Sequence, residues 1–336
     1  MSEMVLEDLS KKYVLKAGFL KQLSGRAGVV SAVDHVSFHM EKGEIVGLVG
    51  ESGCGKTTLG KMLLKIEDIT SGKAYIDGVD LSSVKSRKDI LEFRKKVQMI
   101  FQDPYDSLDP KFTVREIVAE PLRSLKLCRS AEEVNRRVEE TLQLVELTPV
   151  KLYAGRYPHQ LSGGQRQRVA IARALVSDPE FIIADEPVSM LDVSLRAGVL
   201  NLLQKLNRER GIGVLLITHD LATARFLCNR IVVMYLGRFV EITDPDSLVE
   251  EAVHPYTRLL ISSAPDLFAD AGDRIKVEGE AASAVAPPQG CRFYPRCPYT
   301  REICTQSTPE LVERSPGHFA ACHKLSPDFA GPDRAR

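Results

Sequence analysis

The chain has 336 residues, of which 45 are Lys or Arg and 45 are Asp or Glu, so it carries no net charge at neutral pH. This balance excludes an overall basic field of the kind that attracts nucleic acid, and it disfavours DNA and RNA as partners. The length suits one large α/β domain followed by a smaller one. The first residues carry no signal-like leader, and no apolar run approaches the ~20 residues needed to cross a bilayer. We therefore expect a cytosolic protein.

The N-terminal part reads as two short strands joined by a loop. Strands are predicted at 5–9 and 33–40, and the basic, glycine-containing segment 16–28 between them is predicted to be a surface loop. Tyr13 follows the first strand. Its side chain is either an ordinary half-buried aromatic or a platform on which a base could stack.

Residues 50–58 read Gly-Glu-Ser-Gly-Cys-Gly-Lys-Thr-Thr, between an apolar run and a helical segment that starts at Leu59. The glycines allow a tight turn that points successive N–H groups into one concavity, and the helix aims its positive N-terminus there. This pattern is a P-loop. Lys56 would reach the β and γ phosphates of a nucleotide, the Thr57 hydroxyl would ligate Mg²⁺, and Thr58 would support the α phosphate. The predicted phosphate-binding residues are Gly50, Glu51, Ser52, Gly53, Cys54, Gly55, Lys56, Thr57 and Thr58.

The next segment changes from strands to helices. Residues 72–80 are typical of a hairpin that turns at Asp77-Gly78, and 95–101 predicts a strand that ends at Gln102. Apolar residues at helical spacing over 114–145, broken by Pro121, predict a helical insert in the β/α chain.

Two further sites are indicated beyond the insert. Residues 161–165, Leu-Ser-Gly-Gly-Gln, open a helix and form either a second anion site or a plain N-cap turn. The apolar strand 181–185 ends in Asp185 and is followed by Glu186, and a second strand, 213–218, is followed by His219. Because open α/β sheets place ligands at the carboxyl ends of their strands, Asp185 and Glu186 should face the phosphates. His219, at the same sheet edge as the P-loop, is either a structural histidine or part of the site.

These motifs in this order resemble the ATPase subunit of an ATP-binding-cassette transporter, over residues 1 to about 265. The resemblance implies an α/β P-loop NTPase fold with a RecA-like core, an antiparallel β subdomain and a helical subdomain at about 112–176. Narrower stretches look like the branch that energises dipeptide, oligopeptide and nickel importers, and within it the second of two ATPase subunits; some members carry oligosaccharides. Those stretches are 101–110, 156–159, 233–238 and 254–257.

The resemblance also implies roles for single residues. Thr57 and Gln102 would ligate Mg²⁺ directly and Asp185 through water. Glu186 would act as general base or position the attacking water, and His219 would hold that water in line with the γ phosphate. Lys56 would balance the charge that develops on the γ phosphate, and Tyr13 would stack on adenine.

In this family the Ser-Gly-Gly segment reaches nucleotide on a facing subunit, so catalysis would need a dimer. The residues at that interface would be Ser162, Gly163, Gly164, Gln165, Ser189 and Asp192. Met190 stands where relatives usually have alanine. The implied partners are a second, related ATPase subunit, two membrane permease subunits and an extracytoplasmic substrate-binding protein, with this chain at the cytoplasmic face of the membrane. Gln102 would transmit closure on ATP to the helical lobe and the permease.

Residues 266–336 form a predicted C-terminal extension, which begins with a linker-like stretch and a short strand-like run at 274–277. Four of its cysteines suit a 4Fe–4S cluster or a structural Zn²⁺, although no Cys-x-x-Cys pair indicates a zinc ribbon. The same tail in peptide importers resembles one that holds an iron–sulfur cluster, which favours the cluster. The ligands would be Cys291, Cys297, Cys304 and Cys322, with His318 and His323 as possible substitutes.

The other cysteines are Cys54, which would make ATPase activity sensitive to oxidants, and Cys128 and Cys228, which we interpret as ordinary residues.

The sequence favours a transport ATPase over three competing functions. A soluble cassette protein of DNA repair or translation would need tandem cassettes or a long coiled coil, and a nucleic-acid-binding tail would need a basic, aromatic face. An exporter ATPase is disfavoured by the importer-type stretches.

Overall fold

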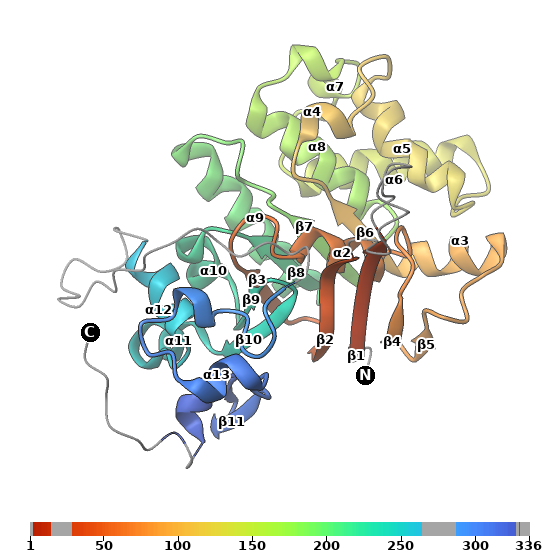
Figure 1. The fold of residues 1–336 in the computed structure, drawn as a ribbon. Helices are drawn as coiled ribbons and strands as arrows, with labels where there is room; N and C mark the ends of the chain where they lie inside the picture. Colours follow the sequence, from red (N-terminus) through yellow and green to blue (C-terminus); the bar gives the residue numbers. More distant parts are fainter. Residues whose placement is uncertain (1–2, 15–28, 264–286, 327–328, 330–336) are drawn as a thin grey trace, which may run out of the picture.

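The computed structural model describes residues 3–14, 29–263, 287–326 and 329. Two sheets, a lobe of helices and a small C-terminal extension make up the described structure (Figure 1). The loop 16–28 and the strand-like run 274–277 that the sequence predicts lie outside the described residues.

An eight-stranded sheet forms the centre, in the order β11-β12-β10-β9-β3-β8-β7-β6. Every residue of β3, β7 and β8 is buried, as expected for parallel strands with helices on both faces. The side chains of β3 alternate between two apolar clusters, one that includes α2 (Lys56–Leu63) and one that includes α10 (Leu221–Leu227). The parallel strands are β3 (Ile45–Val49), β6 (Val97–Ile100), β7 (Phe181–Asp185), β8 (Gly213–Thr218) and β9 (Arg230–Tyr235).

The C-terminal extension completes this sheet. Strand β10 (Arg238–Thr243) pairs antiparallel with β9 on one side and with β12 (His318–Ala320) on the other, and β11 (Val312–Ser315) pairs with β12. The extension therefore shares the backbone hydrogen bonds of the core. Its other elements are η3 (Tyr294–Arg296), α13 (Glu302–Gln306) and η4 (His323–Leu325).

A four-stranded antiparallel sheet lies beside the core, in the order β2-β1-β4-β5. The predicted hairpin is confirmed, since β4 and β5 are joined at Asp77 and Gly78, which both have positive φ. The two N-terminal strands are longer than predicted. The strands are β1 (Glu3–Val14), β2 (Val29–Glu41), β4 (Ser71–Ile76) and β5 (Val79–Asp80).

The predicted helical insert is a lobe at the top of Figure 1, packed around α8 (Gly163–Leu175), which contacts α4, α5 and α6. The lobe also contains α4 (Pro104–Ser107), α5 (Val114–Ser124), α6 (Ala131–Leu144), α7 (Val150–Tyr153) and η1 (Pro158–Gln160). The remaining helices are α3 (Arg87–Lys96), α9 (Val193–Arg210), α11 (Pro245–Glu251) and α12 (Pro255–Ser262).

Three predicted boundaries were wrong. The helical insert does not break at Pro121, which lies inside α5; the break comes after Ser124, and α6 starts anew where Ser130 caps it. Packing of α5 against α8 outweighs the one hydrogen bond that proline removes. The strand predicted over 95–101 spans only Val97–Ile100, because its first two residues end α3, where lysines complement the helix dipole. The P-loop helix begins at Lys56 rather than Leu59.

Candidate nucleotide site

The P-loop connects β3 to α2, and two of its glycines are required by close backbone contacts. Gly55, which caps α2, has φ 113°, and a Cβ there would lie 2.0 Å from the Ala32 carbonyl oxygen. A Cβ on Gly50 would lie 2.2 Å from the Met234 carbonyl oxygen. Only glycine fits at these two positions, so neighbouring strands fix the path of the loop.

Lys56 crosses the inside of this loop. Its side chain is buried, with 6% of the residue exposed, and Nζ donates to the carbonyl oxygens of Gly50 at 2.7 Å and Glu51 at 2.9 Å. The ammonium group thus lies within the concavity that the sequence assigned to phosphate, where a positive charge attracts the anion most strongly.

Asp185 ends β7 beside the P-loop helix. It is 4% exposed, and burial raises the pKa of its carboxyl group, although a hydrogen bond from the Thr57 hydroxyl opposes this rise. The other oxygen, Oδ1, is buried without a hydrogen-bond partner. Thr57, Gln102 and Asp185 line one cavity of about 410 Å³. A hydroxyl, an amide and a carboxylate are oxygen donors of the kind that Mg²⁺ prefers, so the residues present fit this ion.

Glu186 lies where three strand ends meet. Its Oε1 is 2.7 Å from His219 Nδ1, and Gln102 Nε2 donates to its Oε2 at 3.5 Å. Its own backbone N–H donates to the Ile217 carbonyl oxygen. The residues that the sequence predicted at separate strand ends are therefore brought together, and they can orient a water molecule in front of the P-loop.

Tyr13, at the end of β1, lies beside the start of α2. Burial raises the pKa of its hydroxyl, which also interacts with Thr58 and Glu67, and Lys11 Nζ lies 4.8 Å from the ring centre. The ring is thus adjacent to the P-loop, as stacking on a nucleotide base requires.

The Ser-Gly-Gly segment is a capped helix start. Ser162 Oγ accepts from the Gln165 N–H, and the Gln165 side chain accepts from the Ser162 N–H, in a capping box. Asp192 caps α9 more simply, since its Oδ1 accepts from the Leu195 N–H at 3.0 Å. On either side of Asp192, Met190 is 59% exposed and Val193 is 81% exposed, and Leu191 packs against Gly163 of the other cap. Large apolar side chains open to solvent beside both caps are typical of an interaction surface.

The four cysteines of the extension, Cys291, Cys297, Cys304 and Cys322, line one cavity that also includes aromatic side chains. Burial raises the pKa of Cys291 to about 12 and that of Cys322 to about 11, and the neighbouring thiols add to both shifts. Among the described residues, no group of three or more His, Cys, Asp or Glu side chains could hold a single metal ion.

The two histidines considered as substitute ligands have other partners. His318 Nε2 lies 2.8 Å from the buried Glu241 carboxylate, and His323 Nε2 lies 2.8 Å from the Ser307 carbonyl oxygen. Burial raises the pKa of the Cys54 thiol, which opposes the predicted sensitivity to oxidants. Cys228 is buried and Cys128 is half-buried, as ordinary residues would be.

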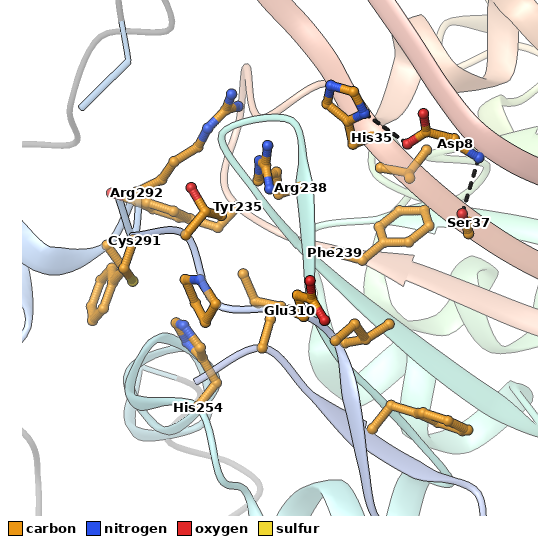
Figure 2. Close-up of a pocket in the computed structure, with 18 residues that line it drawn as sticks. Asp8, His35, Ser37, Tyr235, Arg238, Phe239, His254, Cys291, Arg292 and Glu310 are labelled. Carbon is orange, nitrogen blue, oxygen red and sulfur yellow. Dashed lines mark hydrogen bonds and ion pairs between the residues drawn. The ribbon is translucent and has the colours of Figure 1, made fainter. Parts of the chain in front are cut away.

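A cavity of about 710 Å³ lies between the small sheet, the β9–β10 hairpin and the C-terminal extension (Figure 2). Its polar lining groups include His35, whose ring lies 2.7 Å from the Asp8 carboxylate, and Arg238, paired with the buried Asp34. The first pair lies within the small sheet and the second joins that sheet to β10, and neither involves a P-loop residue.

Sequence reasoning missed two contacts of the P-loop. The Tyr256 hydroxyl accepts from the Glu51 N–H at 2.8 Å, and Arg296 of the extension forms an ion pair with the Glu51 carboxylate. Tyr256 lies in the importer-type stretch 254–257, which was a usable signal. No local pattern marks Arg296, because its partner is 245 residues away.

The fold and the site together define a nucleotide-hydrolysing cassette. Residues 33–189 match the family described as ABC transporter. The dimeric structure of the ATP-binding cassette MJ0796 in a post-hydrolysis state, bound to ADP and Pi, superposes with a TM-score of 0.63 at 32% identity, covering 72% of this chain and 98% of that one. CbiO1 from Clostridium perfringens, part of the ABC transporter complex cbiONQ, superposes with a TM-score of 0.62 at 25% identity, covering 79% and 95%. The expected fold class is confirmed.

The chain belongs to the ATP-binding-cassette transporter ATPases, in the oligopeptide and dipeptide transporter branch. Residues 240–304 match the family described as oligopeptide/dipeptide transporter, C-terminal region. The oligopeptide transport ATP-binding protein AppF of Bacillus subtilis is 44% identical over 96% of this chain and 97% of its own length. The putative oligopeptide transport ATP-binding protein YkfD of the same organism is 48% identical over 89% and 91%. Among the described helices, none is long and apolar enough to span a bilayer.

Proposed function

We propose that this ATPase drives the import of peptides through a membrane permease made by other polypeptides. The observation that carries the proposal is that the likeness to peptide-transport ATPases extends beyond the cassette into the C-terminal region, at 240–304. The permease subunits, an extracytoplasmic binding protein and a second, related ATPase subunit complete the transporter, and this chain binds at its cytoplasmic face.

Hydrolysis follows from the placement of the chain's own groups. Tyr13 stacks on adenine, the P-loop N–H groups and Lys56 bind the phosphates, and Glu186 and His219 orient a water molecule in line with the γ phosphate. The water oxygen bonds to the γ phosphorus as the bond to the bridging β–γ oxygen breaks, and Glu186 receives the water's proton. Thr57, Gln102 and Asp185 would hold Mg²⁺, which would neutralise charge on the phosphate oxygens.

The Ser-Gly-Gly half of the site serves nucleotide on the facing ATPase subunit. This assignment is supported by the exposed apolar residues that flank the cap of α9, Met190 and Val193, and by the dimeric structure of the similar MJ0796 cassette. Ser162, Gly163, Gly164, Gln165, Ser189 and Asp192 form this surface.

Uptake into proteoliposomes tests the cargo. Vesicles that hold the full transporter, with its binding protein outside and ATP inside, should accumulate labelled di- and oligopeptides, and vesicles with Glu186→Gln should not. Accumulation of an oligosaccharide or Ni²⁺ in place of peptides would assign the chain to one of the other branches of importers.

We further propose that Cys291, Cys297, Cys304 and Cys322 hold a 4Fe–4S cluster. Their convergence on one cavity supports it, and the lack of a Cys-x-x-Cys pair in their spacing disfavours a zinc ribbon.

Anaerobic purification should yield coloured protein with a broad absorption band at about 400 nm and about four irons per chain. Cys304→Ser should lose the band, whereas Cys128→Ser, a cysteine outside the cavity, should keep it. Colourless wild-type protein with one zinc per chain would contradict the cluster and leave the ATPase assignment intact.

A further inference from the structure

The C-terminal extension reaches into the nucleotide site through one side chain. The 3-10 turn η3 lies between Cys291 and Cys297, and Arg296 ends it. Its Nη1 donates to both carboxylate oxygens of Glu51, the second residue of the P-loop, at 3.0 and 3.2 Å, and its Nη2 donates to Oε1 at 3.2 Å. The Arg296 side chain is only 12% exposed, so this forked ion pair is largely shielded from solvent.

Aromatic rings fix the direction of Arg296. Its guanidinium carbon lies 6.0 Å from the ring centre of Tyr235 and 5.7 Å from that of Phe293. These two rings pack edge to face, and Tyr256 packs against both. A guanidinium group held against two buried rings, which a third ring supports, has little freedom to turn away from Glu51.

The same aromatic cluster holds the backbone of Glu51. The Tyr256 hydroxyl accepts from the Glu51 N–H, while the Glu51 carbonyl oxygen accepts from Lys56 Nζ at 2.9 Å and from the Cys54 N–H at 3.3 Å. The side chain, the N–H and the carbonyl of Glu51 are therefore all bound. A shift of Glu51 would displace the lysine that the phosphates require.

We infer that Arg296 is a positioning residue for the ATPase reaction. Its ion pair with Glu51 holds the P-loop and Lys56 in the arrangement that binds phosphate. The cysteine-lined extension is then part of the nucleotide site, and whatever moves the turn between Cys291 and Cys297 changes nucleotide affinity. The inference rests on nucleotide binding at this P-loop, which the wild-type chain tests separately.

The test compares Arg296→Gln, Arg296→Lys and Glu51→Gln with the wild-type full-length chain. Direct titration with a fluorescent ADP in Mg²⁺ should show that Arg296→Gln weakens binding about tenfold. Arg296→Lys keeps the positive charge but cannot contact the carboxylate through two nitrogens, so it should retain part of the nucleotide affinity that Arg296→Gln loses. The Arg296–Glu51 ion pair supports nucleotide binding equally in the ground state and the transition state. Arg296→Gln should therefore raise KM for ATP in the assembled transporter, while kcat changes less than about twofold.

Arg314→Gln is the matched control, since Arg314 lies in the same extension but pairs with Glu251, and it should bind like wild type. The double variant Glu51→Gln with Arg296→Gln should bind no more weakly than the worse single variant, because both remove one interaction. If Arg296→Gln lowers the melting temperature but leaves the ADP affinity and KM unchanged, the contact only tethers the extension and the inference is wrong. Additive losses in the double variant would also overturn it. Failure of the wild-type chain to bind ADP would instead contradict the proposed nucleotide site.

Discussion

Glu186 combines an unusual backbone with a central position in the site. Its φ of 46° lies in the left-handed region, which residues other than glycine rarely adopt, and its N–H is bound to the Ile217 carbonyl oxygen of the neighbouring strand. This conformation turns its carboxylate toward His219 at the end of β8. Backbone strain of this kind persists where surrounding structure enforces it, and it is concentrated at functional sites.

At the scale of this residue, Glu186→Gln should separate binding from hydrolysis. Glutamine keeps the size of the side chain but cannot take up a proton, so affinity for Mg²⁺-ATP should stay within about twofold while hydrolysis falls at least ~100-fold. Nucleotide titration and phosphate release measure the two effects. Glu139→Gln, on the solvent face of α6, should change neither. Near-normal hydrolysis by Glu186→Gln would remove Glu186 from its proposed role.

At the scale of elements, Asp34 of β2 joins three parts of the structure. Its Oδ2 lies 2.6 Å from Arg238 of β10 and 2.6 Å from Arg292 of the extension. Burial favours the neutral acid, but the Arg292 and Arg238 guanidinium groups overcome it and hold the pKa of Asp34 below its ordinary value. The small sheet, the core sheet and the extension are thus tied by one carboxylate.

Asp34→Asn should therefore destabilise the chain by about 3 kcal/mol at neutral pH, because it leaves two largely buried arginines without their counter-charge. Folding lowers the pKa of Asp34, so its carboxylate stabilises the folded chain fully at pH values above the unfolded pKa of about 3.9. This stabilisation is lost as the pH falls through the lower pKa of the folded state. In denaturant titrations, the difference in free energy of unfolding between wild type and Asp34→Asn should stay constant from about pH 8 to 5 and decrease only below about pH 4.

Asp8→Asn provides the comparison, because the Asp8–His35 pair is exposed and should contribute less than about 1 kcal/mol. The proposed role of Asp34 would be contradicted if Asp34→Asn and wild type had the same free energy of unfolding at neutral pH. It would also be contradicted if their difference grew in acid.

At the scale of the whole molecule, the two predicted phosphate-binding segments lie on different parts of the chain. The P-loop lies at the carboxyl edge of the central sheet, whereas the Ser-Gly-Gly cap belongs to the helical lobe. If the cap serves the facing subunit, a change there should spare nucleotide binding by its own chain and impair hydrolysis by the assembly.

Ser162→Asp tests this division. Aspartate is as good an N-cap as serine, so α8 should stay intact, but its charge would repel a phosphate that faces the cap. ADP affinity of the isolated chain should stay within about twofold, and hydrolysis by the assembled ATPase should fall at least ~10-fold. Ser130→Asp, the same exchange at the cap of α6, should leave both unchanged. A loss of affinity in the isolated chain would place the cap at its own P-loop.

Much of the fold and the site follows from short stretches of sequence. The P-loop, the buried strands that end in Asp185 and before His219, and the hairpin at Asp77-Gly78 each depend on neighbours within about ten residues, so their patterns carry the structure directly. Short-range patterns fail at boundaries, as at Pro121, where packing against a distant helix decides whether α5 continues.

Only the tertiary structure decided how the extension contacts the core. The sequence by itself determined that four cysteines lie in a compositionally distinct tail. It did not determine that β12 pairs with β10, that the thiols line one cavity, or that Arg296 forms an ion pair with Glu51. Asp34 and Arg292 are 258 residues apart, and no periodicity records which distant side chains meet. Such contacts depend on the order of strands in the sheet, which is a property of the whole chain; the local sequence determines the chemistry of the site, and the assembled sheet determines which residues hold it in place.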